Sequence, residues 1–321
     1  MKLLLLSTTL ILAVASTAFA RDNVQVTGSS TVLPYATIVA EAFGENFDFQ
    51  TPVVEGGGSG AGRKKLCEGV GENTVDIANS SSKMKDEERA KCEEAIGEIT
   101  EVRIGYDGIV FASNIDQLNI DNLTVEQLYS ALHESSTAKL WSDVDSTLPA
   151  VEILAYIPGT KHGTREVFDV KVMEAGCKAA LGVEKLDDDQ KKACVKVRTD
   201  GASVDIDGDY TETLARLDAN KTALGVFGLS FYQNNTDKLE VATVSGVAPS
   251  VETISSGDYP ISRPLYFYVK NAHIGVIPGL KEYIEFFVSD EMAGPGGPLA
   301  NYGLVPDPEL AATQEMVTNL K

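Results

Sequence analysis

The chain has 321 residues, of which 43% are hydrophobic, and it carries a formal net charge of −20. Its length is too great for one ordinary core and suits two lobes. The acidity argues against nucleic acid and anionic membrane surfaces as partners, but it does not exclude a small anionic ligand, because local dipoles decide binding at short range.

The first twenty residues have the pattern of a secretory signal peptide. Lys2 supplies the positive start, an apolar stretch follows, and Ala18-Phe19-Ala20 matches the small-x-small pattern of a cleavage site. We therefore expect cleavage after Ala20 and localisation in the periplasm, without a lipid anchor because no cysteine follows the site. No later stretch approaches the roughly 18 uninterrupted apolar residues that suggest a membrane-spanning helix.

Strand, turn and helix follow one another four times along the chain. Alternating or continuous apolar residues predict a strand before each turn, and each turn is rich in Gly, Ser or Thr. The four turns are Gly28-Ser29-Ser30-Thr31, Gly56–Gly62, Asn79–Ser82 and Pro158–Arg165, with the last helix expected from about Glu166. Strands that alternate with helices predict α/β lobes with mostly parallel sheets and flanking helices.

Two further strands are expected to cross between the lobes. The first spans Glu101–Ala112 and is broken by two glycines, and the second spans Pro264–Val269. No low-complexity linker occurs, which favours two ordered hinge crossings over a flexible tether. We therefore predict a signal peptide at 1–20, a first lobe of 21–107 plus 264–321, and a second lobe of 108–263. Trp141, between the two crossings, is expected in a loop.

The chain has four cysteines, an even number that predicts two disulfides in an exported protein. Three pairings are possible, and we favour the two that are local in sequence, Cys67–Cys92 and Cys177–Cys194. A zinc site is disfavoured because the cysteines lack CxxC spacing and a nearby histidine.

We expect neither a metal nor a cofactor. The acidic run from Asp205 to Asp209 resembles the start of a calcium loop but lacks the glutamate that such a loop has at its twelfth position. The histidines are far apart in sequence, and no Walker motif occurs.

The turns themselves predict an anion site. A helix N-terminus presents unpaired N–H groups and the positive end of a dipole, glycine lets a ligand approach the backbone, and hydroxyl groups add donors. One such turn is usually an ordinary helix cap. Four of them at the ends of strands in a predicted parallel sheet favour a cradle for a tetrahedral anion.

These motifs resemble the periplasmic phosphate-binding proteins (PstS) over essentially the whole mature chain. The resemblance implies a two-lobed periplasmic-binding-protein fold of type II. It also implies a monomer that captures inorganic phosphate between its lobes, delivers it to the permease subunits of an ABC transporter, and is not an enzyme. The segments that carry it are Gly28–Pro34, Gly56–Gly60, Asp76–Lys85, His162–Thr164, Tyr259–Val269 and Gly303–Pro306.

The resemblance also implies a set of ligand residues from both lobes. Hydroxyl and backbone N–H groups of the turns would donate to the phosphate, and a cation near the last turn would complete the site. The implied residues are Ser30, Thr31, Ser59, Ser81, Ser82, His162, Gly163, Thr164 and Arg165.

The third turn departs from the family pattern. Some members have an Asp there that accepts the phosphate proton and rejects sulfate, and others have an Arg beside a Ser, whereas this chain has Ser81 and Ser82. We take a backbone carbonyl or Asp107 as the candidate replacement for that acceptor.

Arg165 is the first candidate for the cation, ahead of Lys161 and His162, because its planar fork can give two hydrogen bonds to one oxyanion. The alternative for Arg165 is a surface ion pair with Glu166 or Asp169.

Other functions stay open at this point. The same scaffold could bind another oxyanion such as sulfate, or it could serve as a phosphate sensor or adhesin. An exported phosphatase is less favoured, because Ser30 or Ser59 would be its nucleophile and no His/Asp set or metal cluster accompanies either serine.

Overall fold

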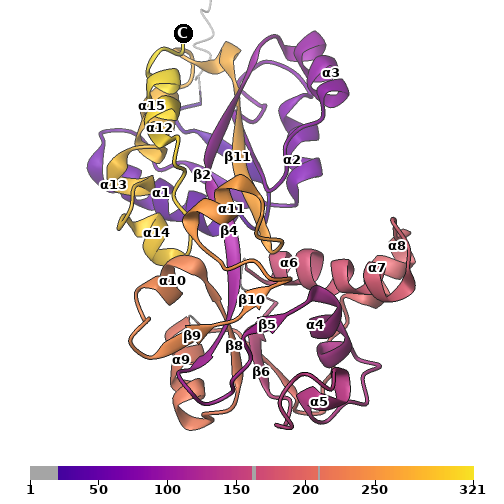
Figure 1. Ribbon diagram of the computed structural model, residues 1–321. Coiled ribbons are helices and arrows are strands. Elements are labelled where there is room, and N and C mark those ends of the chain that lie inside the picture. Colours follow the sequence, from indigo (N-terminus) through magenta and orange to yellow (C-terminus); the bar gives the residue numbers. More distant parts are fainter. Residues whose placement is uncertain (1–20, 161–163, 209) are drawn as a thin grey trace, which may run out of the picture.

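The computed structural model describes residues 21–160, 164–208 and 210–321. The predicted signal peptide, Lys161 to Gly163, and Asp209 therefore lie outside the described residues. Figure 1 shows two groups of helices and strands, one above the other, with β4 and β11 running between them. None of the helices in these ranges is long and apolar enough to cross a membrane.

The strands and helices alternate along most of the chain, as predicted. The strands are β1 Gln25–Gly28, β2 Val53–Gly56, β3 Ile77–Ser80, β4 Ile99–Asn114, β5 Asn122–Leu123, β6 Ala155–Pro158, β7 Ser203–Ile206, β8 Leu224–Gly228, β9 Leu239–Val241, β10 Thr243–Val244 and β11 Ser262–Lys270. The helices are α1 Leu33–Asn46, α2 Ser59–Leu66, α3 Asp86–Ile96, α4 Val125–Leu132, α5 Trp141–Val144, α6 Thr164–Val167, α7 Ala175–Leu181, α8 Asp188–Cys194, α9 Tyr210–Ala219, α10 Leu229–Gln233, α11 Val251–Ser256, α12 Leu280–Phe287, α13 Asp290–Ala293, α14 Pro298–Tyr302 and α15 Leu310–Thr318. A π-helical stretch, Phe168–Glu174, joins α6 to α7, and a 3-10 turn, Asn271–His273, follows β11.

Most of the described strands form one continuous sheet in the order β2-β1-β3-β11-β4-β8-β6-β7, with β9 also paired to β4. The pairs among β2, β1 and β3 are parallel, and so are those among β8, β6 and β7. The middle of the sheet is antiparallel, because β11 pairs with both β3 and β4, and β4 pairs with β8. Two parallel units are therefore joined through the antiparallel pair β4/β11.

Each unit has its own hydrophobic core. One core packs α1 and α12 against β1 and the first part of β4, and it includes Phe43 and Tyr283. The other packs α4, the helix from α6 onward, and α9 against β6, β8 and the last part of β4, and it includes Phe168 and Phe227. The two largest clusters of buried apolar residues in the described chain thus lie in different units, which confirms the two lobes that the chain length predicted.

The strands β4 and β11 pass from one core to the other. In β4, Val102 and Ile104 are buried in the first core, whereas Ile109 and Phe111 are buried in the second. Ile261, the residue just before β11, is buried in the second core, so the chain passes from the second core to the first at the start of β11. Both changes lie near the predicted boundaries at 107/108 and 263/264, whose exact positions remain a prediction.

Some local expectations need correction. Trp141 is not in a loop but begins the short helix α5 and is fully buried. The helix expected from about Glu166 begins at Thr164. For Trp141, tertiary packing of a large apolar side chain outweighs weak local propensity.

The structure pairs Cys67 with Cys92 and Cys177 with Cys194, which is the local pairing favoured from sequence. The first disulfide links the end of α2 to α3, and the second links α7 to α8. Each bridge lies within one lobe, so neither restricts movement of the lobes against each other.

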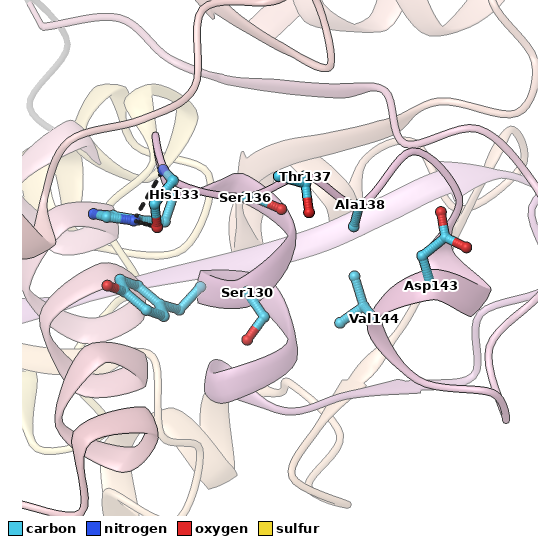
Figure 2. A pocket seen from close by; sticks show the side chains of 9 residues that line it. Ser130, His133, Ser136, Thr137, Ala138, Asp143 and Val144 are labelled. Atoms are coloured by element: carbon cyan, nitrogen blue, oxygen red, sulfur yellow. Dashed lines mark hydrogen bonds between the residues drawn. The ribbon is translucent and has the colours of Figure 1, made fainter.

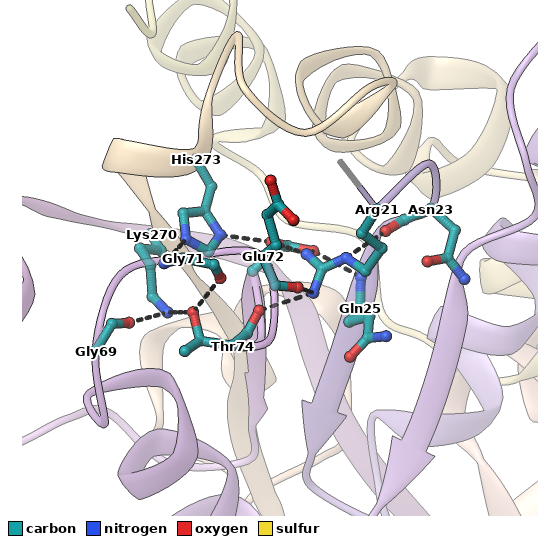
Figure 3. A network of polar contacts seen from close by, with 10 residues as sticks. Arg21, Asn23, Gln25, Gly69, Gly71, Glu72, Thr74, Lys270 and His273 are labelled. Atoms are coloured by element: carbon teal, nitrogen blue, oxygen red, sulfur yellow. Dashed lines mark hydrogen bonds and ion pairs between the residues drawn. The ribbon is translucent and has the colours of Figure 1, made fainter. Parts of the chain in front are cut away.

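A polar network holds the start of the described chain against the first lobe (Figure 3). The guanidinium of Arg21 donates to both carboxylate oxygens of Asp76, and His273 Nδ1 lies 2.6 Å from the same carboxylate. Lys270 Nζ donates to Gly69 O and to the hydroxyl of Thr74. Burial lowers the pKa of Lys270 to about 8. This network fixes the loop before β3 and lies away from the turns at the strand ends.

Gly105 is required where β4 leaves the first core. Its φ is +144°, and a Cβ there would lie 2.7 Å from the carbonyl oxygen of Val305. The next residue, Tyr106, exchanges two backbone hydrogen bonds with Val305, at 2.9 and 2.8 Å. A side chain at this position would therefore strain the backbone and push the two segments apart.

We predict that Gly105→Ala lowers the free energy of unfolding by roughly 1–3 kcal/mol, measured by urea denaturation. Gly60→Ala is the matched control: this glycine lies in α2, and a Cβ there would meet no atom within 4 Å. The control should be neutral or slightly stabilising. Equal stability of the Gly105 variant and wild type would contradict the requirement for glycine at this position.

Candidate functional site

The three turns of the first lobe meet at one edge of the sheet. Because β1 lies between β2 and β3 and is parallel to both, the carboxyl ends of the three strands coincide. Gly58 N–H donates to Gly28 O at 2.8 Å, and Ser29 N–H donates to Asn79 O at 2.9 Å. A Cβ on Gly28 would lie 2.2 Å from the oxygen of Asn79, so this close approach requires glycine.

Some predicted donors are used within the turns. Thr31 N–H donates to Ser29 Oγ at 3.2 Å, so this backbone group caps its own turn. Ser59 Oγ lies 3.1 Å from Ser81 Oγ and accepts the N–H of Ser81 at 3.0 Å. The structure therefore brings Ser59 and Ser81 into contact, while Ser30 is exposed. Their roles as ligands remain a prediction.

Arg63 supplies a cation to the third turn. From α2 its Nη1 donates to Ser80 Oγ at 2.7 Å and to Ser82 Oγ at 3.3 Å. Its Nε donates to Glu88 at 2.8 Å. Sequence reasoning did not single out Arg63, although its spacing of four residues from Ser59 on one helix places both side chains on the same face. Its guanidinium lies beside the turn in which this chain lacks an arginine of its own.

The second lobe reaches the site through the start of α6. Thr164 is buried, and its hydroxyl lies 2.7 Å from the hydroxyl of Tyr210. The side chain of Arg165 is engaged by two carboxylates, with Nε 2.7 Å from Asp169 and Nη1 3.0 Å from Asp205. This is the ion-pair role considered from sequence as the alternative to a ligand role. Lys161, His162 and Gly163 lie outside the described residues.

A second arginine that sequence reasoning missed, Arg263 of β11, takes a central place. Its side chain is only 9% exposed, and its Nη2 donates to the hydroxyl of Thr31 at 2.7 Å. The same Nη2 lies 3.4 Å from Glu166, whose carboxylate also accepts the hydroxyl of Thr31. The Glu166 carboxylate of the second lobe therefore contacts a hydroxyl of the first lobe and the guanidinium of β11, at the junction of the two lobes.

Asp107 faces the same region from β4. It is directly paired with Arg263 in the β4/β11 register and is 4% exposed. Burial raises the pKa of Asp107 to about 6, opposed by Arg263 and assisted by Glu166. Burial and Asp107 together raise the pKa of Tyr35. Among the described residues, nothing hydrogen-bonds to Asp107 Oδ2 or to Arg263 Nε.

A separate pocket lies on the second lobe, between α4 and α5 (Figure 2). It has a volume of about 530 Å³ and is lined mainly by hydroxyl-bearing and small side chains. His133 at its edge is already bonded to Ser135 and to the carbonyl of Ala193. The pocket has no Lys or Arg in its lining, so it lacks the cations that the lobe junction offers.

Across 21–160, 164–208 and 210–321, no group of three or more His, Cys, Asp or Glu side chains is arranged to hold a metal ion. Within the acidic run considered from sequence, Asp205 instead pairs with Arg165.

We predict that Asp107→Asn stabilises the ligand-free protein at neutral pH. A folded-state pKa raised from 3.8 to about 6 means that the fold favours the neutral carboxyl. That contribution is complete below pH ~4 and is lost as the pH rises through about 6, which corresponds to at most about 3 kcal/mol. Unfolding followed at several pH values should show the variant more stable than wild type near pH 7, with the difference shrinking near pH 4. A difference independent of pH would contradict the burial of an ionised carboxylate.

Comparison with known proteins agrees with this geometry. A family model described as the PBP superfamily domain matches residues 13–291. The chain is 31% identical to the phosphate-binding protein PstS of Staphylococcus saprophyticus over 82% of this chain and 75% of that protein. It is 29% identical to PstS of Staphylococcus haemolyticus over 90% of this chain and 82% of that protein.

Solved structures agree as well. A possible phosphate binding protein from Planctomyces limnophilus has a TM-score of 0.72 at 26% identity, covering 93% of this chain and 98% of that one. An ABC-type phosphate transport receptor from Vibrio cholerae has a TM-score of 0.58 at 20% identity, covering 89% and 100%, and shows a shared fold. These likenesses confirm the predicted type II two-lobed fold. The chain therefore belongs to the PBP superfamily and, within it, to the PstS family of phosphate-binding proteins.

Proposed function

We propose that this protein captures inorganic phosphate between its two lobes and delivers it to an ABC importer. The observation that carries the proposal is the junction of Thr31, Glu166 and Arg263, where a hydroxyl of the first lobe and a guanidinium of the hinge strand converge on a carboxylate of the second lobe. The names of the PstS relatives and of the Vibrio cholerae receptor support phosphate as the ligand and transport as the purpose. The predicted signal peptide supports action outside the cytoplasmic membrane.

The chemistry of the junction suits a tetrahedral anion. At the junction Thr31 supplies a hydroxyl donor and Arg263 a cation. The second and third turns add the hydroxyl groups of Ser59 and Ser81 and the cation of Arg63. Hydrogen bonds to charged groups are shorter and stronger than neutral ones. The Glu166 carboxylate occupies donors that a phosphate would use, so we infer that it moves when phosphate enters. Rotation about β4 and β11 would then close the lobes on the ligand.

We propose that the protein acts as a binding protein and not as a phosphatase. The hydroxyl of Ser59 contacts another serine, Ser81, rather than a base that could remove its proton. The described residues also offer no metal-binding group that could activate water. Assay with a generic phosphate ester tests this directly, and turnover above background would contradict it.

The hydroxyl of Thr31 should be required for tight binding. We predict that Thr31→Val weakens phosphate binding roughly 10- to 100-fold, because a hydrogen bond to a charged ligand is lost. Isothermal titration calorimetry measures the change. Thr37→Val is the matched control, since Thr37 lies on α1 and its hydroxyl donates only to Leu33 O. Wild-type protein that releases no heat with phosphate but binds another oxyanion would overturn the proposed function.

Removing the charge of Glu166 should strengthen binding. We predict that Glu166→Gln raises phosphate affinity several-fold, because the variant loses an internal anion that competes for Thr31 and Arg263 and repels the ligand. The gain should shrink with added salt, because Glu166 is 43% exposed. Glu126→Gln, on α4, is the control. Weaker binding by the Glu166 variant would show that this carboxylate supports the site instead of competing for it.

A further inference from the structure

A cavity crosses the boundary between the lobes at the hinge strands, and we call it the hinge pocket. It has a volume of about 330 Å³, within the usual range of roughly 300–1,000 Å³ for small-molecule sites. From the first lobe it is lined by Arg103 and by Tyr266, which packs with residues of α2 and α3. From the second lobe it is lined by Lys171 and by part of α11, a helix that contacts both hinge strands (Figure 1).

The hinge pocket is distinct from the junction at which we place phosphate. Tyr106 and Pro264 line the pocket and are paired in the β4/β11 register. The neighbouring pair in that register is Asp107 and Arg263, which face the junction. Because successive side chains of a strand leave opposite faces of the sheet, the pocket lies on the face opposite to the junction. None of the described residues predicted to bind phosphate lines it.

Lys171 brings an unpaired positive charge to the hinge pocket. Its side chain is partly buried, and within the described chain it forms no ion pair or hydrogen bond. Burial lowers the pKa of its ammonium group, and the cations of Arg263 and Lys178 lower it further. An opposite charge at short range favours the charged form of such a group. An anion beside Lys171 would therefore be stabilised in this pocket.

The walls of the hinge pocket suit a ring. Tyr106, Tyr259 and Tyr266 line it together with Pro260 and Pro264. Aromatic side chains gain energy from offset or edge-on contact with another ring. The hydroxyl groups of Tyr106 and Tyr266 have no hydrogen-bond partner among the described residues, although the two side chains are only 6% and 7% exposed. These hydroxyl groups are available as donors to an acceptor group of a ligand.

The other cation of the hinge pocket is already neutralised. Arg103 Nε lies 2.6 Å from the carboxylate of Asp307, and its Nη2 lies 2.5 Å from that of Glu309. These two carboxylates disfavour a second negative charge at their end of the pocket. The lining therefore fits a ring that carries one negative charge better than it fits a compact, multiply charged oxyanion.

We propose that the hinge pocket is a second binding site, separate from the phosphate site, for a small aromatic carboxylate that bridges the two lobes. The carboxylate pairs with the ammonium group of Lys171, and the ring packs against the tyrosines. Because this ligand contacts both lobes, it holds their present angle. At that angle Glu166 accepts the hydroxyl of Thr31, a donor that phosphate would use. The aromatic carboxylate therefore opposes phosphate binding, a consequence that rests on the proposed function.

The first test measures the binding of para-fluorobenzoate to wild type by fluorine NMR in phosphate-free buffer. We expect saturable binding. The uncharged analogue para-fluorobenzamide should bind roughly 10-fold more weakly, because it lacks the charge that pairs with Lys171. This comparison needs no variant. Lack of saturable binding of the carboxylate, or equal binding of the two probes, would overturn the proposed site.

Variants locate the probe on the chain. Lys171→Met should weaken para-fluorobenzoate binding roughly 10-fold, because methionine keeps a long side chain and removes the charge. Lys185→Met, at an exposed position of the second lobe, is the matched control and should bind the probe as wild type does. Thr31→Val should also bind it as wild type does, since Thr31 lies at the phosphate site. Normal binding by the Lys171 variant, or lost binding by the Thr31 variant, would overturn the site.

The second test titrates phosphate calorimetrically with and without saturating para-fluorobenzoate. We expect phosphate affinity to fall several-fold with the probe present. Saturating phosphate should lower the affinity for the probe by the same factor, because coupling between two sites is reciprocal. A probe that binds but leaves phosphate affinity unchanged would overturn the bridge between the lobes. Wild-type protein that binds no phosphate would remove the proposed function alone, because the first test contains no phosphate.

Discussion

The antiparallel pairing of β4 with β11 is the constraint on which the rest of the structure depends. The paired register runs from Ser262 opposite Gly108 to Lys270 opposite Ile99, with one irregularity beside Leu265. These two strands carry the chain between two separate cores and join two parallel units into one sheet. A hinge made of two hydrogen-bonded strands can bend while the pairing of the strands is kept.

The same pairing brings charged residues to the junction of the lobes. Asp107 and Arg263 are far apart in sequence but are direct neighbours across the two strands. The hinge therefore also contributes side chains at the site, and a ligand held there would contact both lobes and the strands that connect them. Under the proposed function, this arrangement would couple occupancy of the site to the angle between the lobes, because a ligand can favour one conformation only through contacts that differ between conformations.

The site also shows why net charge is a poor guide to the ligand. The chain has a formal charge of −20, yet Arg263 lies at the junction, and Arg63 and several hydroxyl groups lie at the turns that follow the strands. At contact distance these donors outweigh distant surface carboxylates, whose effect is screened beyond about 10 Å by salt. The acidic surface instead contributes to solubility and disfavours other acidic partners.

The sequence by itself determined the α/β class, the two lobes, the three turns of the first lobe and the local disulfides. Each of these follows from short-range patterns such as Gly28-Ser29-Ser30-Thr31, from hydrophobic periodicity, or from cysteine spacing. It also led to the family, because several separated motifs agree.

Only the tertiary structure decided which charged groups meet at the junction. Arg263 and Glu166 lie on elements distant in the chain, and their contact depends on strand order and register. Arg63 meets the third turn for the same reason. Arg165, adjacent in sequence to a predicted ligand, turns instead to Asp169 and Asp205. The physical reason is that the direction of a side chain is set by its helix face and by the elements packed against it. Local sequence patterns also do not determine which distant strands pair, as β4 does with β11.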